Sequence, residues 1–400
     1  MASSPYAGAP GRLPTQADVV VVGAGIVGAA CAYYTARAGL RVAVVERAAV
    51  AAGTTGAGEG NLLISDKLPG PELDLMAHSL RRWPELADAC DADFELEPKG
   101  GVVVASSAAG LASLRDLGAA QRARGVQVVD VDSAGLTELE PHLVPDLPGG
   151  AWYPQDRQVQ PALAAAALLR LAIREHGVSV HTGVTVVGIG RGRGERVTSV
   201  QTSRGRIATP AVVNAAGVWS PEVARLAGLD LPVLPRRGFI LVTQRLPDLV
   251  RHKVYAAEYL ASVVSDDAAL QVAPVVESTR SGTVLIGSSR ERVGFERRVS
   301  LPALRRIAAG AVKLFPVLAG AAVMRAYQGL RPYSPDNLPL IGPDPRLPGL
   351  FHATGHEGAG IGLAPATGEL IAAIITGAEP PVDPTPFRPE RFAEVPADGG

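Results

Sequence analysis

The stretch Asp18-Val-Val-Val-Val-Gly-Ala-Gly-Ile-Val-Gly28 decides the fold, and Arg41-Val-Ala-Val-Val-Glu46 follows it one helix length later. The run from Val19 to Val22 is short and β-branched, which predicts a strand buried on both faces. A strand, a glycine loop, a helix and a second strand ending in an acid are typical of a site that holds a dinucleotide.

Each chemical feature of this unit has a physical task. We expect Gly23 to make the tight turn, Gly25 to let the backbone approach a pyrophosphate, and Gly28 to let the helix pack closely on the strands. The unpaired amides of the first helical turn favour phosphate. Glu46 lies 18 residues after Gly28, where a carboxylate accepts both ribose hydroxyls and repels the 2′-phosphate of NADP. The alternatives are an ordinary glycine-rich turn and a membrane anchor over residues 19–36, against which the three glycines argue.

The composition restricts the class of protein. A chain of 400 residues with 47% hydrophobic residues predicts two domains with ample core. A net charge of −1 gives no attraction to nucleic acid. The two cysteines, Cys31 and Cys90, lack the spacing of a disulfide or metal site, so we expect no metal. The first 16 residues lack the apolar core of a signal peptide, which favours a cytoplasmic location, and the composition suggests a bacterial source.

Downstream segments predict an interrupted domain. The loop from Ala51 to Asn61 is rich in glycine, which lets backbone lie against a flat ligand or wrap phosphates, although a flexible linker is the alternative. Helical periodicity covers 71–92, and a strand pair is predicted at 94–96 and 101–105. The stretch 91–150 breaks the nucleotide-binding pattern, so we interpret it as an insertion.

The second half alternates between the two patterns. We expect a helix to His176, capped by Gly177, and then an antiparallel meander with strands at 184–189, 197–202 and 207–214. The meander ends on Ala-Ala-Gly217, whose backbone would lie beside the dinucleotide unless this is merely a packed strand end. Strands predominate over 231–295, as in a sheet that covers a substrate cavity, and a helix is predicted from Leu301 to Leu314.

Four motifs resemble one known family: DVVVVGAGIVGAACAYYTARAGLRVAVVER, VVNAAGVWS, GLRPYSPDNLPLIG and HATGHEGAGIGLAPATGELIA. The family is that of the FAD-dependent amino-acid and amine oxidoreductases, which includes D-amino acid oxidase, glycine oxidase and sarcosine oxidase. In motif style the chain is most similar to the flavin subunits of hydroxyproline dehydrogenase, opine oxidase and hydrogen cyanide synthase.

The resemblance implies an α/β (α+β) fold in which a Rossmann-like FAD-binding domain is interleaved with an antiparallel β-sheet substrate domain. It implies FAD-binding parts at 17–90, 151–225 and 325–380, substrate-binding parts at 91–150 and 226–324, and flexible termini at 1–16 and 381–400. FAD would be extended and bound non-covalently. Some sarcosine oxidases attach the flavin through a cysteine near the motif that here holds Gln328 and Gly329, and this sequence has no cysteine beyond Cys90.

The resemblance also implies site residues. Arg331 in the GLRP motif would pair with a substrate carboxylate, for which a planar guanidinium is well suited, and His356 and Glu357 would lie beside the flavin as catalytic residues. There are three alternatives. Arg331 could pair structurally with Asp336, His356 could be a packing residue, and the carboxylate partner could be Arg236 or Arg237. Tyr255 and Tyr259 are candidate substrate contacts, or ordinary strand aromatics. The predicted FAD contacts are Gly23, Gly25, Ile26, Val27, Gly28, Glu46, Arg47, Thr54, Thr55, Gly60, Asn61, Val184, Ala216, Gly217, Gly355, Gly358, Gly360 and Ile361.

These features favour oxidation of the C–N bond of an amino or imino acid, of D-amino acid, glycine, N-methyl glycine, proline or opine type, with hydride transfer to flavin N5 and formation of an imine. The acceptor would be oxygen or another molecule. Some sarcosine oxidases carry an oxygen-activating lysine in a strand that resembles 282–287, and this segment has none, so the resemblance weakens direct use of oxygen. A homo-oligomer or small electron-transfer subunits are possible partners. The rival hypotheses are a 2-hydroxyacid oxidoreductase on the same fold and a non-catalytic flavoprotein subunit.

Overall fold

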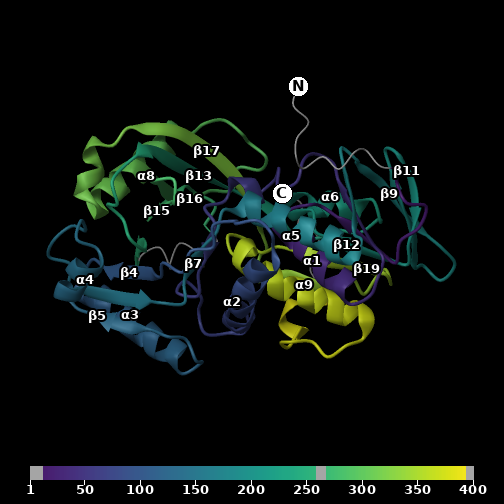
Figure 1. The fold of residues 1–400 in the computed structure, drawn as a ribbon, viewed down its shortest axis with the longest axis horizontal. Helices are drawn as coiled ribbons and strands as arrows, with labels where there is room; N and C mark the ends of the chain where they lie inside the picture. The colour runs from purple at the N-terminus through teal and green to yellow at the C-terminus, as the bar shows by residue number, and fades with distance from the viewer. Residues whose placement is uncertain (1–11, 258–266, 393–400) are drawn as a thin grey trace.

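The computed structural model describes residues 12–257 and 267–392. Two large sheets organise these residues, and they lie side by side with helices packed on both (Figure 1). The predicted α/β fold class is confirmed. Within the described residues, every helix is too short or too polar to cross a membrane.

A six-stranded sheet forms the nucleotide-binding half, in the order β18-β19-β12-β1-β2-β8. Neighbouring strands are parallel, except that β18 runs antiparallel to β19. The strands are β1 (Val19–Val22), β2 (Val42–Glu46), β8 (Ser179–Thr182), β12 (Ala211–Asn214), β18 (Leu340–Pro343) and β19 (Leu350–Thr354). Strand β1 is central and buried on both faces, as its unbroken valine run predicts.

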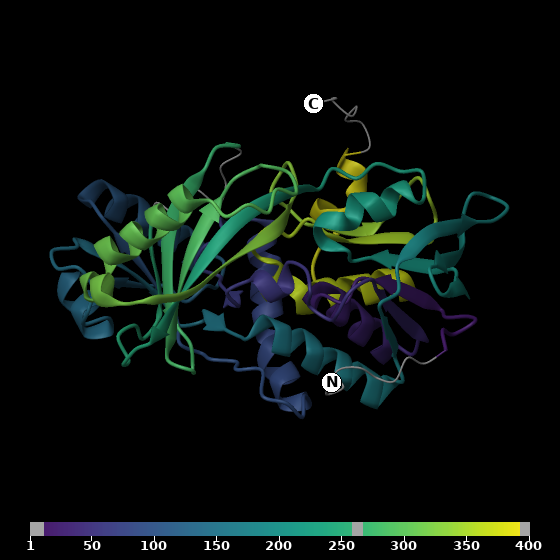
Figure 2. The same cartoon turned by 90° about the horizontal axis from the view of Figure 1, so that it is seen from above.

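Three long helices cover this sheet: α1 (Ile26–Arg37), α5 (Pro161–His176) and α9 (Gly360–Thr376). Helix α1 packs against both of the others, which Figure 2 shows from above. The α1–α9 crossing is close because Gly368 faces the backbone of Ala30, where an added Cβ would lie 2.6 Å from the carbonyl oxygen. Gly177 ends α5 in the left-handed conformation, as predicted.

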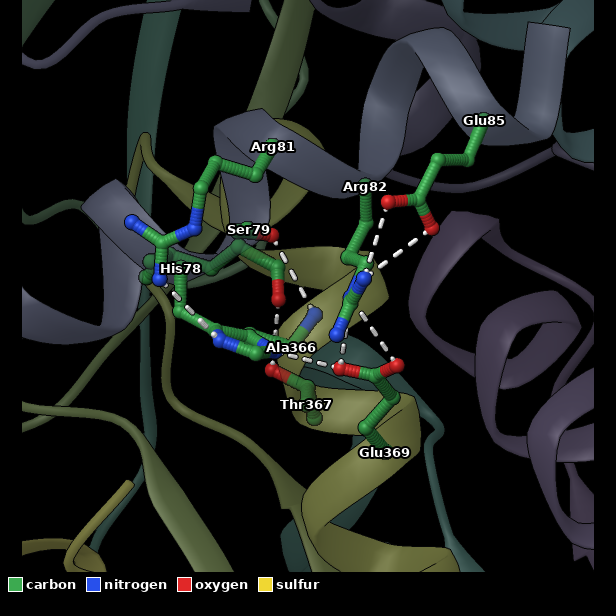
Figure 3. Close-up of polar contacts among 9 residues, drawn as sticks. His78, Ser79, Arg81, Arg82, Glu85, Ala366, Thr367 and Glu369 are labelled. Atoms are coloured by element: carbon green, nitrogen blue, oxygen red, sulfur yellow. Dashed lines mark hydrogen bonds and ion pairs between the residues drawn. The ribbon is translucent and has the colours of Figure 1, made fainter. Parts of the chain in front are cut away.

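A further helix, α2 (Pro71–Ala89), is joined to α9 by a polar network (Figure 3). Glu369 accepts hydrogen bonds from His78 and Arg82, and Arg82 also pairs with Glu85. Burial alone would raise the pKa of Glu369, but the hydrogen bond from His78 and the charge of Arg82 outweigh it and hold that pKa below its ordinary value. The network fixes the position of α9, whose N-terminal end borders the functional cavity described below.

The second half is an eight-stranded sheet in the order β17-β13-β16-β15-β14-β4-β6-β5. Its strands are β4 (Gly101–Ala105), β5 (Val129–Val131), β6 (Gly149–Tyr153), β13 (Leu234–Arg245), β14 (Lys253–Ala256), β15 (Gln271–Ser278), β16 (Thr283–Arg290) and β17 (Val323–Tyr333). Pairing is antiparallel apart from β14 with β4. Helix α8 (Leu301–Leu314) lies on this sheet, and α3 (Ala108–Arg122) and α4 (Ser133–Leu139) lie near β4 to β6.

The observed structure differs from the predictions at several points. Residues 207–214 are not one strand: β11 (Gly205–Ala208) stays with β9 (Val186–Arg191) and β10 (Val197–Thr202), whereas β12 pairs with β1. Residues 94–96 form no strand, and β17 extends the eight-stranded sheet into the range 325–333. The C-terminal stretch packs on the protein as far as residue 392, with Phe387 buried.

Candidate active site

A cavity of about 600 Å³ extends from the C-terminal ends of β1 and β2 to the edge of the eight-stranded sheet. Segments distant in the sequence line it: 22–27, 45–61, 184–186, 215–226, 238–240, 288–297, 329–332 and 353–361. The glycine-rich loop joins its two ends, since Thr54 donates to the carbonyl of Leu330 at 2.6 Å and Tyr327 donates to that of Gly58 at 3.4 Å.

The glycines at the start of α1 adopt conformations that other residues would disturb. Gly23 has φ +110°, and an added Cβ would lie 2.6 Å from the carbonyl oxygen of Ala215. A Cβ on Gly28 would overlap the carbonyl of Gly23, so this glycine serves packing and does not line the cavity. Gly25 caps the helix without a side chain, so backbone amides remain available at this helix terminus.

Polar side chains surround this helix terminus. The Ile26 amide donates to Thr55 Oγ1 at 3.1 Å. Glu46 accepts from the Ala24 amide at 2.9 Å and from the Ala48 amide at 2.8 Å, which fixes its carboxylate at the cavity wall. A carboxylate oxygen has more than one lone pair, so Glu46 retains acceptor capacity for ribose hydroxyls.

Most predicted FAD contacts lie on this cavity. Those that line it are Gly23, Gly25, Ile26, Val27, Glu46, Arg47, Thr54, Thr55, Gly60, Asn61, Val184, Ala216, Gly217, Gly358, Gly360 and Ile361. Gly355 does not: it has φ +77°, and an added Cβ would lie 2.7 Å from Leu340 Cδ1, so it serves a turn. The helix N-terminus without a side-chain cap, the Glu46 carboxylate on the wall and the volume of the cavity fit FAD.

The far end of the cavity holds a buried charged cluster. Oε1 of Glu357 lies 3.5 Å from Arg290 Nε, 3.7 Å from Arg236 Nη1 and 3.9 Å from Arg331 Nε. Burial opposes ionisation of Glu357, but the three guanidinium groups outweigh it and lower its pKa. Arg290, Arg331 and Glu357 line the cavity, which gives this end a surplus of positive side chains.

The Arg331 guanidinium is hydrogen-bonded to a backbone carbonyl and has further N–H donors for a ligand. Its Nη1 donates to the carbonyl of Ser289 at 2.8 Å, and a guanidinium carries five N–H groups. The alternative pairing with Asp336 is not observed, because that carboxylate binds Arg391. Of the other candidates, Arg237 pairs with Glu291 at 2.8 Å and does not line the cavity.

His356 is buried at the cavity and bonded to α9. Its Nε2 lies 3.0 Å from Thr367 Oγ1, and burial lowers its pKa to about 3. The imidazole is therefore neutral at physiological pH. His356 therefore packs against α9 and also lines the cavity.

Of the two predicted tyrosines, Tyr255 is among the described residues, and it does not line the cavity. Tyr255 is fully buried and donates to Ser65 Oγ at 2.6 Å. Tyr259 lies outside the described residues. Sequence reasoning missed Glu59, Ser288, Arg290 and Arg297, all of which line the cavity. The clue for Glu59 was an acid inside an otherwise small, neutral loop; the two arginines and Ser288 follow a predicted strand and carry no distinctive spacing.

Fold and cavity together define an α/β dinucleotide-binding protein. Residues 18–374 match the family model described as FAD dependent oxidoreductase (DAO). The chain therefore belongs to the DAO family of FAD-dependent oxidoreductases, and FAD is its cofactor. The resemblance noted from the sequence is confirmed.

Curated relatives and solved structures agree with this assignment. The chain is 32% identical to a glycine oxidase of Pseudomonas putida, covering 93% of this chain and 98% of the relative. It is 30% identical to hydrogen cyanide synthase subunit HcnC of Pseudomonas protegens, covering 95% and 97%. The crystal structure of glycine oxidase from Geobacillus kaustophilus superposes with a TM-score of 0.83 at 28% identity, covering 96% of this chain and 100% of that one.

Proposed function

We propose that this enzyme oxidises the C–N bond of an amino or imino acid to an imine. The observation that carries the proposal is the location of Arg290 and Arg331 on the same cavity as the dinucleotide-binding loop. Guanidinium groups fix a carboxylate through paired hydrogen bonds and so orient the neighbouring carbon. The substrates named for the glycine oxidase relatives have this chemistry.

The protein's own residues would orient the reactants. Gly25, Glu46 and Thr55 would hold the ADP part of FAD, and the loop from Gly58 to Asn61 would border its reactive part. Bound FAD supplies a two-electron acceptor that takes a hydride. Arg331 would hold the substrate carboxylate, while Glu357 would keep the arginines in place by compensating part of their charge.

His356 contributes no proton at neutral pH under this proposal, because its imidazole is already neutral. Its role would be to shape the cavity wall through the contact with Thr367. Hydride transfer needs an uncharged amine, so a substrate ammonium must first lose its proton, and a proton lost to solvent needs no dedicated base. We expect oxygen or another molecule to accept the electrons. We also expect a cytoplasmic location, and a homo-oligomer or small electron-transfer subunits as partners.

An anaerobic panel read at the flavin absorbance tests the proposal. D-amino acids, L-amino acids, glycine, sarcosine, prolines and opines are each mixed with the FAD-loaded protein, and bleaching is followed before oxygen or a dye is added. We expect at least one amino or imino acid to bleach the flavin. Bleaching by 2-hydroxy acids alone would overturn the proposal in favour of the hydroxyacid reaction, and no bleaching by any compound would favour a non-catalytic subunit.

A further inference from the structure

Glu59 is a buried carboxylate on the cavity wall that the mechanism above does not use. It is 9% exposed. Its Oε2 accepts from Asn61 Nδ2 at 2.9 Å, whereas Oε1 has no hydrogen-bond partner among the described residues. A buried acceptor left without a partner costs about 1–3 kcal/mol, and more when it is charged. Such a cost indicates that a ligand group completes the site.

The surrounding backbone leaves space for this carboxylate. A Cβ on Gly287 would overlap Glu59 Oε1, so a side chain on that strand would displace the acid. A Cβ on Gly60 would overlap the carbonyl of Val159, which shows how closely the loop is pressed against the start of α5. The position of Glu59 is therefore fixed from two sides.

The same cavity contains groups of opposite charge. Arg290 and Arg331 line it together with Glu59. The loop that carries Glu59 is hydrogen-bonded to β17, the strand of Arg331, through Thr54 and Gly58. A carboxylate substrate that engages a guanidinium leaves Glu59 unmatched unless the substrate also carries a cation. A zwitterion satisfies both ends, whereas a 2-hydroxy acid brings no positive charge.

We propose that Glu59 binds the nitrogen of the substrate, accepting a hydrogen bond from its ammonium group through Oε1, and thereby selects amino acids over carboxylic acids of the same shape. This inference rests on the proposed function and assigns a specificity residue within it. Relative to a ligand lacking nitrogen, a charge-assisted bond of about 1.5–3 kcal/mol corresponds to a preference of about 10- to 150-fold.

Three ligands without an α-hydrogen test the assignment, because FAD-dependent oxidation cannot consume them. These are 2-aminoisobutyrate, 2-hydroxyisobutyrate and pivalate, each titrated into the FAD-loaded protein and followed by the flavin absorbance and by calorimetry. We expect the wild-type protein to bind 2-aminoisobutyrate at least tenfold more tightly than pivalate. In Glu59→Gln the ratio should fall to about 1, and in Glu59→Asp it should be intermediate.

Two controls separate this role from others. Glu140→Gln alters a buried carboxylate that accepts hydrogen bonds from the Arg251 and His252 amides and does not line the cavity, and it should keep the wild-type ratio. Arg331→Ala should weaken all three ligands alike. If Glu59→Gln changes the FAD dissociation constant but not the ratio, Glu59 serves the cofactor and the proposal is overturned.

The remaining outcomes are also decisive. A wild-type protein that binds 2-aminoisobutyrate and pivalate equally overturns the proposal. If none of the three ligands binds, the test instead measures the KM of the amino acid that bleaches the flavin. An unchanged KM in Glu59→Gln then overturns the proposal. Amino acids that bleach the flavin while the ratio stays unaffected would refute the role of Glu59 and leave the proposed function standing.

Discussion

Removal of the Arg331 guanidinium is the most direct perturbation of the substrate site. In Arg331→Ala the strand pairing of β17 with β13 is kept, because it uses backbone groups. The dinucleotide loop also keeps its bond from Thr54 to the Leu330 carbonyl. We therefore expect FAD to remain bound while substrate affinity falls.

The magnitude follows from the donors that are lost. A bidentate contact consists of two charge-assisted hydrogen bonds, each worth about 1.5–3 kcal/mol. The Arg331 side chain is 16% exposed, so solvent competes and the lower value applies. Two bonds then amount to about 3 kcal/mol, or about a hundredfold in affinity. Arg331→Lys keeps the charge without the fork and should lose about tenfold.

The assay measures the KM of the best amino acid from the anaerobic panel, together with the FAD dissociation constant by flavin fluorescence. Arg325→Ala is the matched control, because Arg325 is exposed on the same strand and does not line the cavity. A KM within twofold of wild type in Arg331→Ala, with FAD retained, would refute the reasoning and leave Arg290 as the carboxylate partner to test.

Three further changes probe the cofactor loop and the buried titratable groups. Gly28→Val forces a side chain into the carbonyl of Gly23 and should cost about 1–3 kcal/mol, seen as a lower Tm and weaker FAD retention; an unchanged Tm would contradict the close packing. Asp344 is buried, but hydrogen bonds that include one from His352 hold its pKa far below the ordinary value. The stabilisation it gives is therefore present above the unfolded pKa of about 4 and lost as the pH falls below it. Asp344→Asn should lower Tm at neutral pH and flatten the acid limb of a Tm-against-pH curve, and an unchanged limb would argue against this linkage. His356 has its pKa lowered to about 3, so the unfolded chain binds a proton between pH 6.5 and 3 that the folded protein excludes. Stability should fall as the pH falls through that window, less steeply in His356→Asn, as thermal unfolding would record.

Local sequence patterns predicted the elements whose signal lies within their own residues. The buried valine run of β1, the Ala-rich helix α5 that ends at Gly177, and α8 all have the predicted bounds. In each case the signal lies within the element: an unbroken apolar run, a C-terminal glycine, or helical periodicity.

Pairing between distant strands left no such signal. Residues 207–214 were predicted as one strand, yet Thr209 and Pro210 separate β11 from β12, and β12 inserts between β1 and β19. Proline lacks an amide donor and therefore interrupts a ladder. The parallel neighbours that β12 acquires are far away in the sequence, so local periodicity could not identify them.

The candidate site shows the same limit at the level of single side chains. His356 and Glu357 are adjacent in the sequence, and the motif predicts that both lie beside the cofactor. Glu357 adopts a positive φ of 48°, and the two side chains have different neighbours: His356 contacts Thr367 of α9, whereas Glu357 contacts arginines from β13, β16 and β17. A neutral imidazole and an ionised carboxylate result from this one turn. The motif therefore predicts where the loop lies, but the charge state of each residue depends on the strands that fold against it.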